Sequence, residues 1–395
     1  MLSPDVDERD IFDDPPLASD YVVHDGLRFV QPYFFDHFAF VKTRWQGSTV
    51  VDLFTKEFKG RSREYYASAF QAGRLRVEET AMTARRVAAK RAADGVGPAE
   101  LKDTPLRDGQ RIRHLVHRHE PPVLAGRVVV LSVTRDVAAV CKPASMPVHP
   151  TGQYRKNSVQ GILACEEAHS LGRLWPVHRL DRNVSGLLLF ARSSAAANAL
   201  RLQITAGAVV KEYVALVAGE WPAGLPTLVD APLRYDYGCR RSVCGSAPSA
   251  KRAATAFVLL ARCGSTSLVA ARPLTGRTHQ IRAHAQHAGF PIANDGCYGG
   301  VAAPAASPHR GGEFEGPRDA LCTHCPWLAP QGQAEDQLDV EALFLHATRY
   351  SSQGWSFEAP LPEWAAAAMP GGALPQGLWD DLPAHALSIV AGEGE

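Results

Sequence analysis

The sequence predicts an α+β protein with two domains, a small N-terminal α/β domain and a larger second domain. Short apolar or alternating segments, which are typical of strands, recur along the chain, and short amphipathic segments with capping residues, which are typical of helices, lie between them. Pro121 and Pro122 interrupt this pattern and mark the boundary between the two domains. A chain of 395 residues is long enough for two such domains with tails at either end.

The overall charge excludes no class of partner, because the formal net charge is only +1. Its distribution is uneven. Residues 1–20 carry seven acidic groups and one basic group, whereas residues 40–120 carry seventeen Lys or Arg and ten Asp or Glu. A basic region behind an acidic tail fits a nucleic-acid-binding protein, although a solvated charged surface produces the same pattern. We expect residues 1–20 to be a disordered acidic tail.

Composition and cysteine content indicate an intracellular globular protein. Apolar residues make up 46% of the chain, which excludes a fibrous or wholly disordered protein. Eight cysteines in a chain of this length do not form a disulfide framework, and we find no secretory leader, so we expect reduced thiols. The acidic start is unlike a mitochondrial transit peptide, which favours the cytoplasm or nucleus over mitochondria. No apolar run approaches the roughly 20 residues of a membrane-spanning helix. We expect a monomer.

Two amphipathic helices begin the N-terminal domain. Ser48 is a good N-cap for a helix that runs to about residue 59, and a second helix runs from Ser62 to Gly73, which we expect at the C′ position. We then predict a strand at 74–77, an Ala-rich basic helix at 84–93 and a strand at 109–116.

Four arginines around these helices are candidate RNA-binding residues, or else part of a solvated charged face: Arg61, Arg63, Arg74 and Arg76. The order of the elements resembles the S4-type RNA-binding domain over residues 48–116, with an insertion near 81–100.

The larger domain, residues 123–364, alternates predicted strands with two helices. Strands are expected at 128–133, 137–142, 187–190, 209–217, 257–260 and 267–270, with ordered sequence at 339–350 and a last strand and turn at 354–364. Helices are expected at 195–205 and from Thr278, as cap, to Gly289. Small residues predict a loop at 236–252 and a flexible insertion at 301–320, and residues 365–395 a loosely ordered tail.

Residues 178–190 concentrate the candidate chemistry. Asp181 lies between Arg179 and Arg182, on a loop that leads into a buried apolar strand. An aspartate in this position is often a turn residue. Two flanking guanidinium groups would instead keep the carboxylate ionised and available as a nucleophile or base. Only one carboxylate stands out, which disfavours an ordinary glycosidase because that chemistry needs two.

Arg277 and Arg282 form a second basic pair. Long helical side chains lean toward the helix N-terminus, so the guanidinium of Arg282 could reach a loop carboxylate, although a solvated basic helix face would show the same pattern. Tyr213 is either a core aromatic of its strand or a stacking platform for a base.

Several motifs now follow one another in a fixed order, and together they resemble the RluA-type pseudouridine synthases over about residues 125–364. They are His178-Arg-Leu-Asp181 with Ser185-Gly186-Leu-Leu-Leu-Phe190, Lys211-x-Tyr213-x-Ala215-Leu-Val, Thr275-Gly-Arg-Thr-His-Gln-Ile-Arg282, Pro291-Ile292, and Asp295 to Gly299. Other motifs resemble the eukaryotic branch of that family, whose members modify transfer RNA: Gly26-Leu27-Arg28, Arg44-Trp45, Glu64-Tyr65-Tyr66, Val116-His-Arg-His-Glu-Pro-Pro122, Lys142-Pro143 through His149-Pro150, and Leu345-His346 to Tyr350.

The resemblance implies the pseudouridine synthase fold, with a mixed, largely antiparallel sheet, and an isomerase that needs no cofactor and no metal. It implies an RNA substrate, with transfer RNA and its anticodon stem-loop region as our expectation. Asp181 matches the catalytic aspartate, Arg282 the arginine that pairs with it, and Tyr213 the tyrosine that stacks on the target base. Arg179 matches the residue that replaces the flipped-out base, and we expect Arg182, Arg277 and His279 to bind RNA beside it.

The chain departs from the family pattern at two places, and several competing hypotheses stay open. Val184 stands where the family commonly has Thr, and the insertion at 301–320 is longer than the compact pattern requires. Cys322-Thr-His-Cys325 suggests zinc, but structural zinc needs four ligands and the sequence shows no second pair, so we expect no metal. An appended zinc deaminase is disfavoured because its motif pair is missing. The sequence is also compatible with an inactive RNA-binding protein and with a synthase that acts on ribosomal or messenger RNA.

Overall fold

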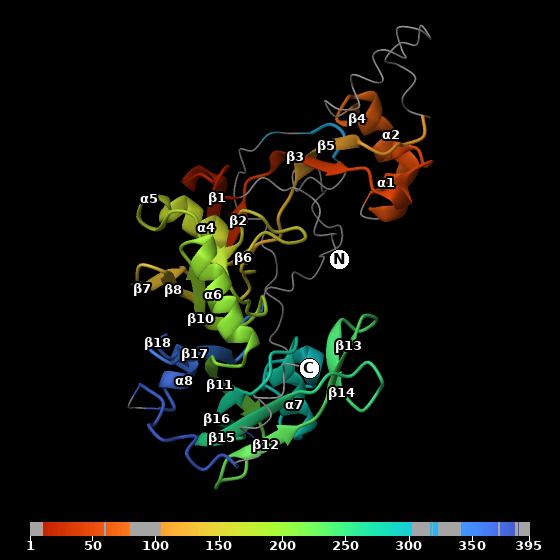
Figure 1. Cartoon of the computed structure of the whole chain (residues 1–395). Coiled ribbons are helices and arrows are strands. Elements are labelled where there is room, and N and C mark those ends of the chain that lie inside the picture. Colours follow the sequence, from red (N-terminus) through yellow and green to blue (C-terminus); the bar gives the residue numbers. More distant parts are fainter. Residues whose placement is uncertain are drawn as a thin grey trace, which may run out of the picture.

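The computed structural model describes residues 11–58, 61–79, 104–301, 317, 319–322, 341–369, 372–383 and 386. The largest unit within them is a ten-stranded sheet, and Figure 1 shows how the other elements are arranged around it. Of its described strand pairs, β10 (Ser185–Ala191) and β17 (Leu345–Ser352) are parallel and the others are antiparallel. The mixed, largely antiparallel sheet that we predicted is therefore confirmed.

The N-terminal part has its own sheet and core. Helices α1 (Val50–Glu57) and α2 (Arg63–Gln71) pack beside a three-stranded antiparallel sheet. Its strands, in spatial order, are β3 (Tyr33–Phe40), β5 (Gln110–Arg118) and β4 (Leu75–Glu79). Buried apolar side chains from both helices and two of the strands form the core, among them Val50, Leu53, Tyr66, Leu75 and Ile112. The short elements are stable because they share this core rather than through intrinsic propensity.

The helix caps agree with the prediction at one helix and differ at the other. Ser62 caps α2 by accepting a hydrogen bond from the Tyr65 N–H, and Gly73 follows the helix with φ +69°. Helix α1 is capped by Thr49, whose hydroxyl accepts from the Asp52 N–H, and not by Ser48. Both residues carry a suitable hydroxyl, so the sequence could not separate them. The predicted helix at 84–93 lies outside the described residues.

Residues 11–30 associate with the larger domain. Strands β1 (Tyr21–His24), β2 (Leu27–Val30) and β6 (Val123–Leu124) form a small sheet after a 3-10 turn, η1 (Ala18–Asp20). Ile11 is buried, and the neighbouring carboxylates bind cations of the larger domain: Asp13 to Arg173, Asp14 to Arg155 and Asp20 to Lys156. We expected residues 1–20 to be disordered. The described half, residues 11–20, instead packs against the larger domain, because the ion pairs with that domain neutralise its carboxylates.

The large sheet runs in the order β12 (Thr227–Asp230), β15 (Ala254–Cys263), β16 (Thr266–Pro273), β11 (Val210–Ala218), β17, β10, β8 (Val137–Lys142) and β7 (Val129–Val133). Strand β9 (Trp175–Pro176) pairs with β10, and β18 (Trp355–Glu358) pairs with β17. Figure 1 shows α6 (Ser194–Thr205) beside β10 and α7 (Gln280–His287) beside β16. Leu187 to Ala191 of β10 are buried, as the apolar run predicted. The remaining short elements are η2 (Thr43–Trp45), α4 (Val159–Glu166), α5 (Ala168–Leu171), η4 (Gly296–Tyr298) and α8 (Glu363–Ala366).

Two expectations, one for the larger domain and one for the tail that follows it, were wrong. The predicted loop at 236–252 contains β14 (Arg241–Cys244), which forms a hairpin with β13 (Leu233–Asp236). This strand is too short and too polar to show an alternating pattern. We expected residues 365–395 to be loosely ordered, but Trp379 and Leu382 pack against Ala254 and Ala270, and the Trp379 indole donates to the buried Glu212 carboxylate. A partner this far away in sequence cannot be inferred from the local pattern.

Gly186→Ala should destabilise the protein by about 3 kcal/mol or more. Gly186 has φ +109°, and an added Cβ would lie 2.2 Å from the carbonyl oxygen of Ala347. The β10–β17 pair would therefore have to separate. Urea unfolding followed by tryptophan fluorescence measures the loss. Gly245→Ala is the matched control because its Cβ meets nothing within 4 Å. Equal midpoints for the two variants would contradict this account of Gly186.

Stability should fall as the pH drops below about 6.5. Burial lowers the pKa of His114 and His178 to about 3 and that of His346 to about 4. The Nε2 atom of His178 carries no hydrogen, because it accepts a hydrogen bond from the Leu189 N–H. Between pH 6.5 and 4 the unfolded chain binds protons that the folded protein does not, so each histidine removes roughly 1.4 kcal/mol of stability per pH unit. Urea midpoints measured from pH 7.5 to 5 test this, and a flat profile would contradict it.

Candidate active site

A pocket of about 760 Å³ lies where several loops and strand ends meet. The loop before β10 supplies His178 to Asp181, β11 supplies residues up to Tyr213, and β16 and the segment after it supply residues 272–282. A pocket of this size and mixed lining is typical of a site for a small organic group. The pocket brings together Asp181, Arg179, Tyr213, Arg277, His279 and Arg282.

Asp181 is partly exposed to this pocket, with about a fifth of its side chain accessible (22%). The Arg282 Nη1 lies 3.4 Å from its Oδ2 atom, and the His279 Nε2 lies 3.6 Å from the same oxygen. The contact with Arg282 joins residues 101 positions apart in the sequence. The predicted approach of Arg282 to Asp181 is therefore present in the structure.

Arg282 is itself held by Asp295, which the sequence analysis placed in a motif but gave no role. The Arg282 Nε and Nη2 atoms donate to the two carboxylate oxygens of Asp295 at 2.6 and 2.9 Å. Asp295 is 1% exposed and Arg282 is 7% exposed. Burial disfavours the charged guanidinium, but the hydrogen bonds and charge of Asp295, with the charge of Asp181, more than offset it and raise the pKa of Arg282. A planar, bidentate pair of this kind fixes the direction of the remaining Nη1.

The turn that leads into α7 has a strained residue at its centre. His279 occupies the N-cap position with φ +53°, in the left-handed region, and Thr278 is not the cap as we had predicted. The amide oxygen of Gln280 instead accepts from the Arg277 N–H at 3.0 Å and from the Thr275 hydroxyl at 2.7 Å. A left-handed non-glycine residue costs about 1–3 kcal/mol and tends to occur at functional sites. Here it places the imidazole beside Asp181.

A hydrogen-bond chain and the Asp181 carboxylate together favour one tautomer of His279. The Ser242 N–H donates to the Tyr298 hydroxyl oxygen at 2.8 Å, and this hydroxyl can donate its own hydrogen to the His279 Nδ1, 3.1 Å away, while Nε2 faces the carboxylate. The ring hydrogen then lies on Nε2 and faces Asp181. Burial and the Arg282 charge lower the pKa of His279, and the Asp181 charge opposes them. We therefore expect a neutral imidazole that donates toward the carboxylate. Tyr298 lies in the Asp295 to Gly299 motif but was given no role, and Ser242 was missed because it lies in the weakly patterned segment 236–252.

Tyr213 lines the pocket from β11 and is 8% exposed. Its hydroxyl lies 2.8 Å from that of Tyr350, a buried residue of β17. Burial raises the pKa of Tyr213 to about 12; the Tyr350 hydrogen bond lowers it, and the Asp181 charge raises it further. The phenol is consequently protonated near neutral pH.

A buried lysine supports the loop that carries Asp181. Lys142, at the end of β8, is 0% exposed, and its ammonium donates to the carbonyl oxygens of Arg182, Pro143 and Met146 at 2.7 to 2.9 Å. Burial lowers the pKa of Lys142 to about 7, and the nearby Asp181 charge opposes that shift. In the sequence, Lys142-Pro143 is part of a motif and was given no role of its own. A lysine at the end of a wholly apolar strand was the available signal for a supporting role.

The other predicted RNA-binding residues fall into two groups. Arg179 and Arg277 line the pocket, whereas Arg182 lies outside its lining and donates to the Tyr154 hydroxyl at 2.7 Å. The four arginines of the N-terminal part also lie outside the lining and contact the protein itself: Arg61 the carbonyl of His117, Arg63 Asp52, Arg74 Asp319 and Arg76 Glu78. In the described part of the chain, no helix has the length and hydropathy needed to cross a membrane.

The chain is similar to known proteins over most of its length. The family of RNA pseudouridylate synthases matches residues 136–287, which include Asp181, Tyr213 and Arg282. RNA pseudouridine synthase 7 of Oryza sativa is 43% identical over 89% of this chain and 93% of its own length. Two Saccharomyces cerevisiae proteins are also similar. The tRNA pseudouridine(32) synthase, mitochondrial, is 34% identical over 87% of this chain and 78% of its own length, and the tRNA pseudouridine(31) synthase is 31% identical over 69% and 72%. This chain belongs to the RNA pseudouridylate synthase family, in its RluA-type branch, and is an isomerase that acts on RNA.

Proposed function

We propose that this protein converts a uridine in the anticodon stem-loop region of transfer RNA to pseudouridine, with Asp181 as the nucleophile. The observation that carries the proposal is the contact of one partly exposed carboxylate with an arginine fixed by a second, buried carboxylate. The substrate class is supported by the names of the two yeast relatives, which refer to transfer RNA positions 31 and 32.

The reaction moves one bond and has no net redox change. The Asp181 carboxylate forms a bond to C1′ of the ribose as the bond between C1′ and N1 of uracil breaks. The base turns in the pocket, C5 then bonds to C1′ as the bond from C1′ to Asp181 breaks, the C5 proton leaves and N1 gains a proton. A single ionised carboxylate suffices because the base never leaves the site. Arg282 and His279 hold the carboxylate in place, so that little reorganisation is needed at the moment of attack.

The pocket must also accept an extruded base. A uridine in a folded RNA is stacked, and an enzyme that acts on it has to flip it out. We assign Tyr213 as the ring that stacks on the target and Arg179, an exposed residue of the lining, as the side chain that enters the vacated position. Because the pKa of Tyr213 is raised, we expect it to act as a neutral phenol rather than as a phenolate base.

Carbodiimide mapping of unmodified RNA tests the function. We expect one modified uridine in the anticodon stem-loop of transfer RNA after incubation with the purified chain. Modification confined to ribosomal or messenger RNA would contradict transfer RNA as the substrate but would still support the isomerase activity. Binding without modification of any RNA would favour an inactive RNA-binding protein.

RNA binding through the N-terminal part, which we interpret as S4-like over residues 48–116, should weaken as salt rises. Phosphate contacts release counterions, so the logarithm of the binding constant should fall linearly with the logarithm of the salt concentration. Because Arg63, Arg74 and Arg76 form ion pairs within the protein, we expect a moderate slope. Filter binding between low and high salt measures it. A flat response would count against this part as the RNA-binding module.

A further inference from the structure

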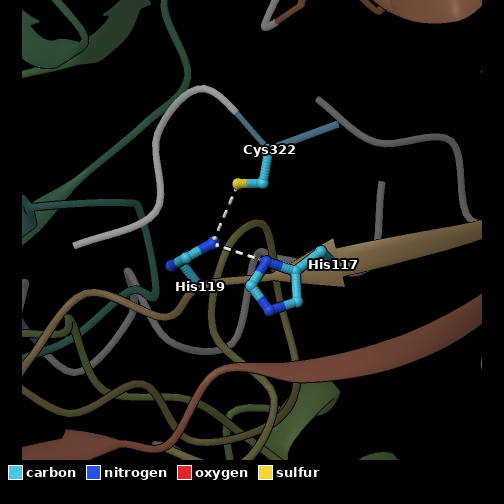
Figure 2. A group of neighbouring side chains, drawn as sticks. All are labelled: His117, His119 and Cys322. Carbon is cyan, nitrogen blue, oxygen red and sulfur yellow. Dashed lines mark hydrogen bonds between the residues drawn. The ribbon is translucent and has the colours of Figure 1, made fainter. Parts of the chain in front are cut away.

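Outside the pocket, two histidines and a cysteine converge on one point. His117 is near the end of β5, His119 follows that strand, and Cys322 is about 200 residues further along the chain. The His119 Nε2 lies 3.1 Å from the His117 Nδ1 and 3.2 Å from the Cys322 Sγ. Figure 2 shows this nitrogen between the other two ligand atoms. All three atoms lie within 4.8 Å of one another, and His117 and Cys322 are buried.

We propose that His117, His119 and Cys322 bind one zinc ion. Zinc in proteins has N and S ligands at about 2.0–2.1 and 2.3 Å, so the ligand atoms of a tetrahedral site are about 3.3–3.6 Å apart. The two contacts of His119 Nε2 are close to these separations. Imidazole and thiolate together favour zinc over magnesium or calcium, which prefer oxygen ligands.

The hydrogen bonding of His117 fits a metal ligand. Its Nε2 lies 2.7 Å from the carbonyl oxygen of Pro317. A carbonyl can only accept, so Nε2 carries the hydrogen and the neutral ring keeps its Nδ1 lone pair directed at the cluster. Metal-binding histidines commonly donate their other ring N–H to a carbonyl in this way.

The hydrogen-bond arrangement within the cluster also points to a cation. If the His119 Nε2 accepts from the Cys322 thiol, it faces the lone pair of the His117 Nδ1. If the His119 Nε2 donates instead, its single hydrogen has to be shared between the His117 Nδ1 and the Cys322 Sγ. A cation between the three atoms would use the lone pairs of both imidazoles and of a thiolate at once, in place of these competing hydrogen bonds.

The segment that carries Cys322 is fixed by contacts that do not depend on a metal. The carboxylate of Asp319 is buried and paired with Arg74, and it also accepts from the Leu321 N–H at 2.9 Å. Leu321 packs against the core of the N-terminal part. The site would thus hold this segment, which follows the pocket residue Arg282 and its partner Asp295 in the chain, at the end of β5. We expected no metal because structural zinc needs four ligands and the sequence shows no second pair of the usual spacing. His117 and His119 instead lie about 200 residues before Cys322.

Elemental analysis of the full chain, purified without chelator, tests the site. We expect about one zinc per chain in the wild type and a loss of at least about tenfold in zinc affinity for Cys322→Ser or His119→Ala. Cys239→Ser, which changes an exposed cysteine outside the cluster, is the matched control and should keep its zinc. Wild-type protein without stoichiometric zinc that also fails to take up added zinc would overturn the proposal.

Cobalt substitution of the wild-type chain gives a test that does not depend on how the variants fold. We expect the intense visible bands of tetrahedral cobalt and a thiolate-to-metal charge-transfer band. One thiolate identifies Cys322 alone. Two thiolates identify a further cysteine ligand, for which the sequence offers Cys325. Either count supports the site, whereas a spectrum without thiolate charge transfer contradicts it. Neither measurement uses isomerase activity, so both are independent of the proposed substrate.

Discussion

Asp181→Asn should abolish pseudouridine formation, with a loss of about 10⁴-fold or more in the single-turnover rate. The amide has the shape of the carboxylate and can still accept from Arg282 and His279, but it lacks the negative charge and the nucleophilic oxygen. RNA affinity should change by less than about threefold, because the phosphate contacts that dominate binding are untouched. Release of tritium from C5-labelled uridine in transfer RNA measures the rate, and filter binding measures the affinity.

Asp136→Asn is the matched control for this variant, because Asp136 is an exposed aspartate outside the pocket lining. It should keep the wild-type rate. If Asp181→Asn and Asp136→Asn form pseudouridine equally well, Asp181 is not the nucleophile. A large loss of RNA affinity in Asp181→Asn alone would instead assign Asp181 to binding.

Local sequence patterns predicted most of the elements that carry the site. The apolar run after Gly186 is a buried strand, β10, and the alternating segment that contains Tyr213 is β11. Both predictions succeeded because an apolar run, or apolar and polar side chains in alternation, indicates a strand in the sequence itself. The prediction of a loop at 236–252 was wrong because β14 has only four residues and shows neither an apolar run nor a clear alternation.

Long-range partners could not be predicted in the same way. The approach of Arg282 to Asp181 was expected from helix geometry and from resemblance to a known family. We did not expect the hydrogen bonds from Arg282 to Asp295. We also did not expect the hydrogen-bond chain from Ser242 through Tyr298 to His279. Each of these contacts depends on how a turn is oriented in three dimensions, and α7 begins at a left-handed histidine that no periodicity indicates.

Replacing Asp295 should have the largest effect on both stability and activity together. Asp295→Asn leaves the Arg282 guanidinium buried without a countercharge at its Nε and Nη2 atoms, which costs about 3–5 kcal/mol when a buried pair is broken. The free energy of unfolding from urea titration measures this cost. The isomerisation rate should also fall, because Arg282 no longer has a fixed orientation toward Asp181.

A double variant separates the two effects. Arg282→Met combined with Asp295→Asn removes both charges, so part of the lost stability should return, since a buried ion pair can often be replaced by apolar groups at little cost. The isomerisation rate should stay low because the contact with Asp181 is gone. If stability and rate recover together, Arg282 only stabilises the fold. If Asp295→Asn alone changes stability by less than about 0.5 kcal/mol, the pair does not hold the site in place. Recovery of stability without recovery of rate would show that Arg282 is needed for the reaction and not only for the fold.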